Sequence, residues 1–497
     1  MPTRNQGNYK TGEGSELPDG PNGRASTNSP RGGLAKIDIV PNNRHALKFG
    51  LRTYDNTFQN SSYEWDVRNR TWTADYHFTP DSPLIDLTVA AYYNDTNLNY
   101  PDATGSYAGR RTQEESYGVS ITNRAQVPLA SGSTVRLEYG LSWDRDDFQT
   151  HAMRGGNHPG KLDKASAFGE AEIDFDRFSL RGGLRYDYWR INGYRPPFAA
   201  GVADCPAGGA ACGDEWAHRD GGRLLPKVGA SYQVSPELTV HASYSHTLRP
   251  PTTHEAFFAL VPFGDGVGSG MTNNLNLKPE FSRNLEFGVD YHGRNLWQPG
   301  DEATLRVSVF RNRIRDFIVN DFVDIPGVGF PRAMWINRDG TTTMKGVEVE
   351  GGYDSGAFYA NFGVALSKTD DQPLGDGAGA GNGEGSALPK RTATLDIGVR
   401  PLDERLTLGA QVRYVGESAQ AAYDWSQFPA GSYWSRSDPY TLVGLYGSYD
   451  ISDVAQAFFT VENLFDKVYG YPGGSSEGYQ AMTGRGRTFT GGLSMRF

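Results

Sequence analysis

From about residue 34 to the C-terminus, apolar and polar side chains alternate along the chain. Residues 238–245 read LTVHASYS, in which the first, third, fifth and seventh residues are apolar or aromatic and the others are polar. The same alternation recurs in residues 85–93, 178–188, 392–400 and 484–497. A period of two places neighbouring residues on opposite faces of a β-strand. The pattern therefore predicts strands that have one apolar face and one polar face.

The lengths of these strands and of the links between them favour a membrane barrel. Many alternating runs reach ten residues, whereas strands of water-soluble proteins average about five or six. Short links such as PNNR, FTPDSP and SPE alternate with long ones such as residues 193–221 and 250–281. Short turns at one end and long loops at the other are typical of outer-membrane barrels. We count about nineteen strands, and we expect an all-β fold: a transmembrane antiparallel β-barrel.

A water-soluble β-sandwich would also alternate, so the polar face matters. It carries Arg, Asp and Glu repeatedly, which suits a wet interior better than a packed layer. The chain contains no run of the ~20 apolar residues that a membrane-spanning helix requires.

The composition mainly excludes other classes of protein. The net charge is -10, which argues against a nucleic-acid partner. Aromatic residues make up 12% of the chain and there are 62 Gly, as strands and turns require. No nucleophile motif with a Ser, His and Asp set stands out, so we expect no enzymatic activity.

The two cysteines lie close together in CPAGGAAC, at Cys205 and Cys212. Two free thiols are one interpretation. The other, which an oxidising outer-surface location favours, is a small disulfide loop. A metal site would need more ligands nearby, and we expect none.

Several motifs, in a fixed order, resemble those of TonB-dependent outer-membrane receptors. HTLRPPTTHEAF (246–257) precedes NLNLKPEFSRNLEFGVDY (274–291), and FRNRIRDFI and KGVEVEGGY follow. VENLFDKVY (461–469) and GRGRTF (484–489) resemble the family's C-terminal signature, which ends on an aromatic residue. The motif residues are Arg249, Pro250, Asn276, Leu277, Pro279, Glu280, Asn463, Leu464, Phe465, Asp466, Tyr469 and Phe497.

The resemblance implies a receptor in the outer membrane of a Gram-negative cell that takes up an iron source. The transported ligand would be heme or a ferric siderophore, with no permanently bound cofactor. The implied partners are outer-membrane lipid and lipopolysaccharide, the energy-coupling TonB complex, and the barrel-assembly machinery that reads the terminal Phe497. A passive porin or a non-functional barrel fragment is the alternative.

RPPT and GRGRTF resemble the heme and hemoglobin receptor branch of this family. In that branch a histidine in the loop between the two central boxes helps to hold the heme iron, and neutral imidazole is a suitable axial ligand. His254 is the histidine of this loop, although it lies close behind the first box and the second box lacks its first proline. His151 and His158, in another long loop, are further candidates.

The family's N-terminal plug and its TonB-docking segment are not recognisable in this sequence. Residues 1–33 are polar, contain no apolar core of a signal peptide, and look like part of an extracellular loop. The first strand-like run is Leu34 to Val40. We therefore expect residues 34–497 to form about nineteen of the family's 22 barrel strands, without a plug domain. Such a truncated form would lack the handle for active import.

Overall fold

The structure is a computed structural model and describes most of the chain. The described residues are 3–4, 7–8, 27–60, 63–101, 109–129, 133–151, 158–196, 213–259, 271–323, 332–369, 389–423, 432–469, 484 and 486–495.

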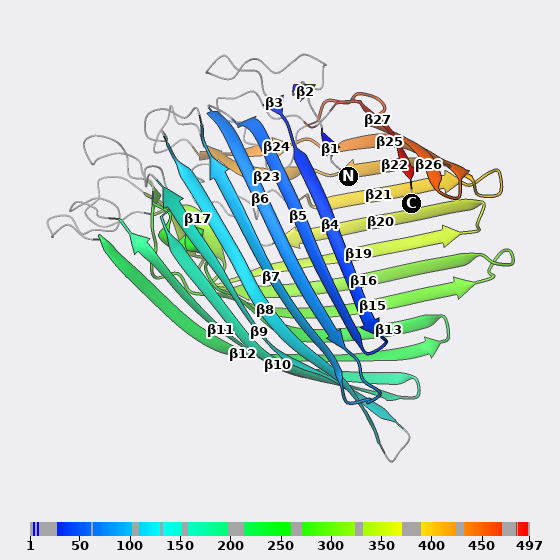
Figure 1. Cartoon of the computed structure of the whole chain (residues 1–497), viewed down its shortest axis with the longest axis horizontal. Helices are drawn as coiled ribbons and strands as arrows, with labels where there is room; N and C mark the ends of the chain where they lie inside the picture. The colour runs from blue at the N-terminus through cyan, green and yellow to red at the C-terminus, as the bar shows by residue number, and fades with distance from the viewer. Residues whose placement is uncertain are drawn as a thin grey trace.

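One large antiparallel sheet dominates the molecule (Figure 1). It has 22 strands, of which nineteen are long and three, β1 (Thr3–Arg4), β2 (Gly7–Asn8) and β3 (Thr27–Asn28), contain two residues each. The long strands are β4 (Arg31–Asn42), β5 (His45–Asn60), β6 (Tyr63–Phe78), β7 (Asp86–Asn99), β8 (Arg111–Pro128), β9 (Thr134–His151), β10 (Gly160–Phe175), β11 (Phe178–Arg195), β12 (Glu215–Ser235), β13 (Leu238–Arg249), β15 (Glu280–Arg294), β16 (Glu302–Arg315), β19 (Thr341–Asp354), β20 (Phe358–Thr369), β21 (Arg391–Val399), β22 (Leu406–Val415), β25 (Tyr440–Ser452), β26 (Ala455–Glu462) and β27 (Thr488–Met495).

Each long strand pairs with the one before and the one after it, and the sheet curves around an interior (Figure 1). The prediction of an all-β antiparallel barrel with about nineteen strands is confirmed. In the described residues, β4 pairs with β5 and with β1, and β27 pairs with β26.

The two faces of the sheet differ as the alternation predicts. On β15 and β16, Phe287 stands opposite Val309, and both side chains are exposed. On the other face of the same two strands, Asp290 and Arg306 stand opposite each other and form an ion pair with a 2.6 Å contact. We call the face with the exposed apolar belt outward and the other face inward.

The two ends of the barrel also differ. Two-residue links join β10 to β11 and β12 to β13 at one end, the turn end. Asp301 organises a longer link there, because its carboxylate accepts hydrogen bonds from the backbone N–H groups of Leu296, Trp297 and Gln298. The end of β11 and the start of β12 lie at the opposite end of the barrel, as do the end of β13 and the start of β15, and we call this the loop end.

Small elements lie outside the main sheet. They are α1 (Thr253–Phe257), the sheet of β14 (Met271–Thr272), β17 (Ile318–Val323) and β18 (Arg332–Asn337), and the hairpin of β23 (Ser418–Tyr423) and β24 (Ser432–Ser437). In the part of the chain that the structure describes, no helix is long and apolar enough to cross a membrane.

Candidate functional site

Arg249 joins the two central sequence boxes at the loop end of the barrel. It lies at the end of β13, and its guanidinium donates to both carboxylate oxygens of Glu280, at 2.8 and 2.6 Å, from the start of β15. It also donates to both oxygens of Glu255 in α1, at 3.0 Å each. Glu255 and Glu280 are 8% exposed, so one guanidinium fork compensates two buried carboxylates.

Helix α1 begins with a complete capping box. The Thr252 hydroxyl accepts a hydrogen bond from the backbone N–H of Glu255, and the Glu255 carboxylate accepts one from the backbone N–H of Thr252. A single helical turn is not stable alone, so the capping box and the ion pair between Glu255 and Arg249 stabilise α1. Pro250 lies two residues before the N-cap Thr252.

The apolar side of α1 packs inside the barrel. Phe257 is 2% exposed and lies in a cluster with Leu162 of β10 and with Trp189 and Ile191 of β11. Gly193 makes this contact feasible, because a Cβ at that position would lie 2.5 Å from the Phe257 ring. The first box is therefore held against the inward face of β10 and β11.

The second box is fixed from two sides. Leu277 is 1% exposed, and Arg219 of β12 donates to the carbonyl oxygens of Leu275 and Leu277 at 2.9 and 2.7 Å. Asn337 of β18 accepts from the N–H of Lys278. Asn276 is exposed and Pro279 is half-buried.

His254 lies on α1 between two aromatic rings. Its imidazole centroid is 4.7 Å from that of Phe258 and 6.0 Å from that of Trp335, which comes from β18. The side-chain amide of Asn274 donates to the Trp335 carbonyl oxygen, so the second box holds this strand in place. The half-buried imidazole therefore lies at the loop end among flat apolar surfaces.

His158 reaches the same segment from the preceding long loop. Its Nε2 lies 3.3 Å from the carbonyl oxygen of Ala259, which assigns the proton to Nε2 and leaves Nδ1 as an acceptor. Nδ1 is buried and has no hydrogen-bond partner among the described residues. Burial lowers the pKa of the His158 imidazole, so the ring stays neutral at neutral pH.

His151 lies apart from this pair. It is exposed at the end of β9, opposite Arg111, on the face that the alternation turns outward. Cys205 and Cys212 lie outside the described residues, and so does Phe497.

Three unpartnered polar groups surround the box region. The Asn273 side chain is 0% exposed, and neither its oxygen nor its nitrogen has a hydrogen-bond partner in the described part of the chain. The same holds for the indole nitrogen of Trp335. Buried polar groups normally find partners, and the ring of Trp335 lies beside His254, so its indole nitrogen leaves one unpartnered donor next to the imidazole. No sequence motif marks Trp335 as a neighbour of His254.

The C-terminal signature has a structural role. Asn463 accepts from the Lys467 N–H at 2.9 Å, and Asp466 accepts from the Arg487 N–H at 2.7 Å. The N–H of Gly484 donates to the carbonyl oxygen of Tyr469. Leu464 is half-buried and Phe465 is 72% exposed. These contacts tie the loop after β26 to the start of β27.

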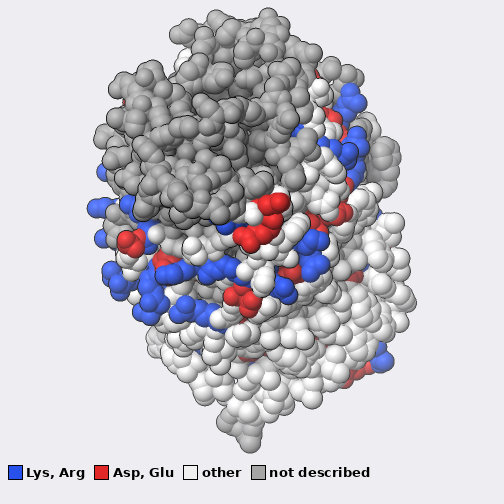
Figure 2. Space-filling view, turned by 90° about the vertical axis from the view of Figure 1, so that its left-hand side faces the viewer, with Lys and Arg blue, Asp and Glu red and all other residues white. Residues whose placement is uncertain are grey.

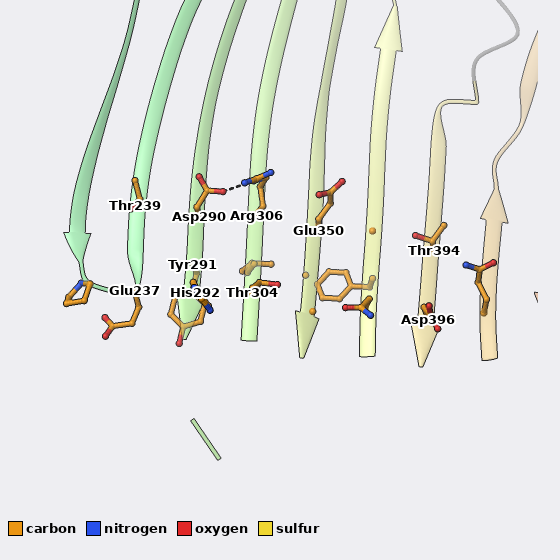
Figure 3. Close-up of a pocket in the computed structure, with 18 residues that line it drawn as sticks. Glu237, Thr239, Asp290, Tyr291, His292, Thr304, Arg306, Glu350, Thr394 and Asp396 are labelled. Carbon is orange, nitrogen blue, oxygen red and sulfur yellow. Dashed lines mark hydrogen bonds and ion pairs between the residues drawn. The ribbon is translucent and has the colours of Figure 1, made fainter. Parts of the chain in front are cut away.

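The inward wall carries charges of both signs. A hollow of about 730 Å³ lies at the turn end and contains Glu237, Asp290, Arg306, Glu350 and Asp396 (Figure 3). Arg306 pairs with Asp290. The carboxylates of Glu237, Glu350 and Asp396 line the same hollow (Figure 3). In the described residues, no group of three or more His, Cys, Asp and Glu side chains forms a metal site.

Known proteins match this chain over most of its length. Residues 4–464 match the family described as "TonB dependent receptor-like, beta-barrel". Heme/hemopexin utilization protein C of Haemophilus influenzae Rd is 22% identical over 85% of this chain and 56% of that protein. The ferrienterobactin receptor of Escherichia coli K12 is 22% identical over 93% of this chain and 64% of that protein.

Solved structures share the fold. The Serratia marcescens hemophore receptor HasR, in complex with its hemophore HasA and heme, superimposes with a TM-score of 0.76 at 23% identity. The alignment covers 100% of this chain and 75% of that one. The chain spans about half the length of the first curated relatives that it matches. The ferrienterobactin receptor and HasR are named as receptors, in agreement with the prediction that the chain is not an enzyme. The chain thus belongs to the TonB-dependent receptor-like β-barrel family.

Proposed function

We propose that the chain forms the barrel of an outer-membrane receptor that takes up heme, and that His254 is a ligand to the heme iron. The observation that carries this proposal is the position of His254 at the loop end, between the rings of Phe258 and Trp335. A porphyrin is flat and apolar, so aromatic side chains offer it stacking surfaces, and neutral imidazole offers its iron an axial ligand.

His158 is the second candidate ligand of the proposal. It is linked to Ala259, and α1 ends at Phe257, so the two histidines approach one segment of the chain from two different loops. The unpartnered Nδ1 atom is the acceptor that an iron ligand requires. His151 remains a weaker candidate, because it lies on the outward face at the end of β9.

A ferric siderophore is the alternative cargo, and the similarity to the ferrienterobactin receptor supports it. The charged inward wall suits a path for either ligand. The remaining parts of the proposal follow family membership: insertion into the outer membrane through the barrel-assembly machinery, and coupling to a TonB complex in the intact receptor. We also propose that the segment 1–33 belongs to a loop up to the start of β4 at Arg31, and that the rest of the chain to residue 497 forms the barrel.

Hemin titration of the detergent-solubilised chain tests the heme proposal. We expect hemin to bind with a shifted Soret band. Replacement of His254 by alanine should weaken binding by about tenfold or more, because an iron–imidazole bond is lost (tenfold corresponds to about 1.4 kcal/mol). His292→Ala is the matched control, since this exposed histidine lies at the turn end of β15, far from α1.

An unchanged Soret band in His254→Ala would reject His254 as a ligand, and the same measurement on His158→Ala would then decide on His158. The unmodified chain is also titrated with a ferric catecholate chelate while its tryptophan fluorescence is measured. If the chain binds no hemin but this chelate quenches the fluorescence, the siderophore alternative replaces the heme proposal.

A further inference from the structure

Trp335 carries a buried hydrogen-bond donor that has no acceptor. The indole has a single polar atom, Nε1, and its N–H can only donate. This atom is buried and has no hydrogen-bond partner among the described residues. The residue as a whole is half-buried, so the indole borders the accessible surface at the loop end. An unpaired buried donor is unfavourable, and a ligand that brings an acceptor to it removes that cost.

The backbone around Trp335 is held firmly in place. The side-chain amide of Asn274 donates to the carbonyl oxygen of Trp335 at 2.8 Å. Two residues further along β18, the side-chain amide of Asn337 donates to the carbonyl oxygens of Lys278 and Asp316, at 2.9 and 2.7 Å. These contacts fix the position of the indole before any ligand arrives, which lowers the entropic cost of binding.

A second unpartnered group lies at the level of Trp335. Strand β14 pairs in parallel with β18, with Thr272 opposite Met334, so Asn273 follows at the level of Trp335. The Asn273 side chain is 0% exposed, and in the part of the chain that the structure describes neither its oxygen nor its nitrogen has a partner. Two neighbouring segments therefore each carry a polar group that the described part of the fold leaves unsatisfied.

The two arginines of the box region are already engaged. Arg249 serves two buried carboxylates, and Arg219 donates to two backbone carbonyl oxygens of the second box. A ligand would have to break these contacts to use either guanidinium. The indole N–H of Trp335 is a donor that a ligand at His254 can use without breaking a hydrogen bond between described residues.

The position of this donor indicates which part of a porphyrin it meets. The rings of His254 and Trp335 are 6.0 Å apart and steeply inclined, with an interplanar angle of 71°. An imidazole that binds the iron lies over the centre of the macrocycle, so a donor on the neighbouring ring lies toward the edge of the macrocycle. The polar groups at the edge of heme are its propionate carboxylates, and an ionised acceptor makes a stronger hydrogen bond than a neutral one.

Surface charge on this side of the molecule also favours an anionic ligand. Figure 2 views the molecule from the side on which β17 lies in Figure 1, and Lys and Arg form a band there with Asp and Glu among them. Such a band attracts anions in general. It does not select a carboxylate at one position, whereas a single oriented donor does.

We propose that Trp335 is a specificity-determining residue whose indole N–H donates to a propionate carboxylate of the porphyrin at His254. The site then prefers a porphyrin with free carboxylates to the same macrocycle with esterified ones. This inference rests on the proposed heme function, and it adds a contact at the edge of the ligand to the axial ligand at its centre.

Comparison of hemin with hemin dimethyl ester tests the proposal. Both ligands have the same iron and macrocycle, but the ester lacks ionised carboxylates. We expect Soret titration of the detergent-solubilised full chain to give a preference for hemin of about tenfold or more. Trp335→Phe keeps an aromatic ring but has no N–H, so its preference should fall to about threefold or less, with the Soret band of bound hemin at an unchanged position.

Trp297→Phe is the matched control. Trp297 lies at the turn end and is 76% exposed, so this variant should keep the preference of the unmodified chain.

Equal affinity of the unmodified chain for hemin and its ester would overturn the proposal, and this measurement does not depend on how a variant folds. A Trp335→Phe variant that keeps the full preference would also overturn it. So would equal losses of affinity for both ligands, which would show that the indole serves only as a stacking surface. If the unmodified chain binds neither porphyrin, the proposed function itself fails, and this inference fails with it.

Discussion

Replacement of Arg249 by methionine should release the first box from the barrel wall. The change leaves Glu255 and Glu280 buried without the guanidinium that contacts both. Removal of one partner of a buried ion pair costs about 3–5 kcal/mol, and we expect about 3 kcal/mol here because the Arg249 side chain is itself 41% exposed. Hydrogen exchange measures the effect as a lower free energy of local opening at α1 and at the start of β15.

Two further variants test whether the effect comes from the contacts of Arg249 with Glu255 and Glu280 or simply from the loss of one positive charge. Arg306→Met removes a cation whose side chain is 64% exposed and which pairs with Asp290 on the inward wall, so we expect about 0–1 kcal/mol there. Arg249→Lys keeps the charge but loses the planar fork that serves two carboxylates, and it should fall between the two. If α1 exchanges equally fast in Arg249→Met and Arg306→Met, the network does not hold the box.

Replacement of Phe257 by alanine should detach α1 from β10 and β11. The ring is 2% exposed in a cluster with Leu162, Trp189 and Ile191, and deletion of a buried Phe side chain costs about 3–5 kcal/mol. The backbone N–H groups of Ala256 and Phe258, which donate within this turn, should then exchange at least about a hundredfold faster.

Gly193→Val tests the same contact from the strand side. A side chain there meets the Phe257 ring, so this variant should also loosen α1. Phe465→Ala is the control, because Phe465 is 72% exposed and its loss should change stability by less than about 0.5 kcal/mol. Unchanged exchange at Ala256 and Phe258 in both Phe257→Ala and Gly193→Val would show that the cluster does not anchor the helix.

Arg249→Met and Phe257→Ala should also affect ligand binding. His254 lies on the same helical turn as Glu255 and Phe257, so a released turn no longer holds the imidazole beside Trp335. We therefore expect Arg249→Met and Phe257→Ala to weaken hemin binding although neither residue is proposed to touch heme. Such a result would identify Arg249 and Phe257 as positioning residues for His254.

The periodicity was sufficient to predict the strands, because side-chain direction in a β-strand depends only on the parity of the position. The run from Phe178 to Tyr188 shows this: the apolar members face outward, while Arg181 and Asp187 face inward. Strand ends were less accurate. The first long strand begins at Arg31 rather than Leu34, because backbone pairing with β5 continues through polar residues that the alternation does not mark.

The surroundings of the candidate site were beyond sequence reasoning. His254 was identified through its place between the two boxes, but Trp335 lies 81 positions later in the chain and carries no motif. Local pattern carries no information on which distant positions face each other.

The sequence by itself determined the all-strand fold, the inward and outward faces and the family, because each of these depends on local alternation or on motifs in order. The tertiary structure decided that one arginine connects two boxes and that His158 and His254 meet the same segment. Those outcomes depend on the register and curvature of the sheet, which bring together residues that are far apart in the chain.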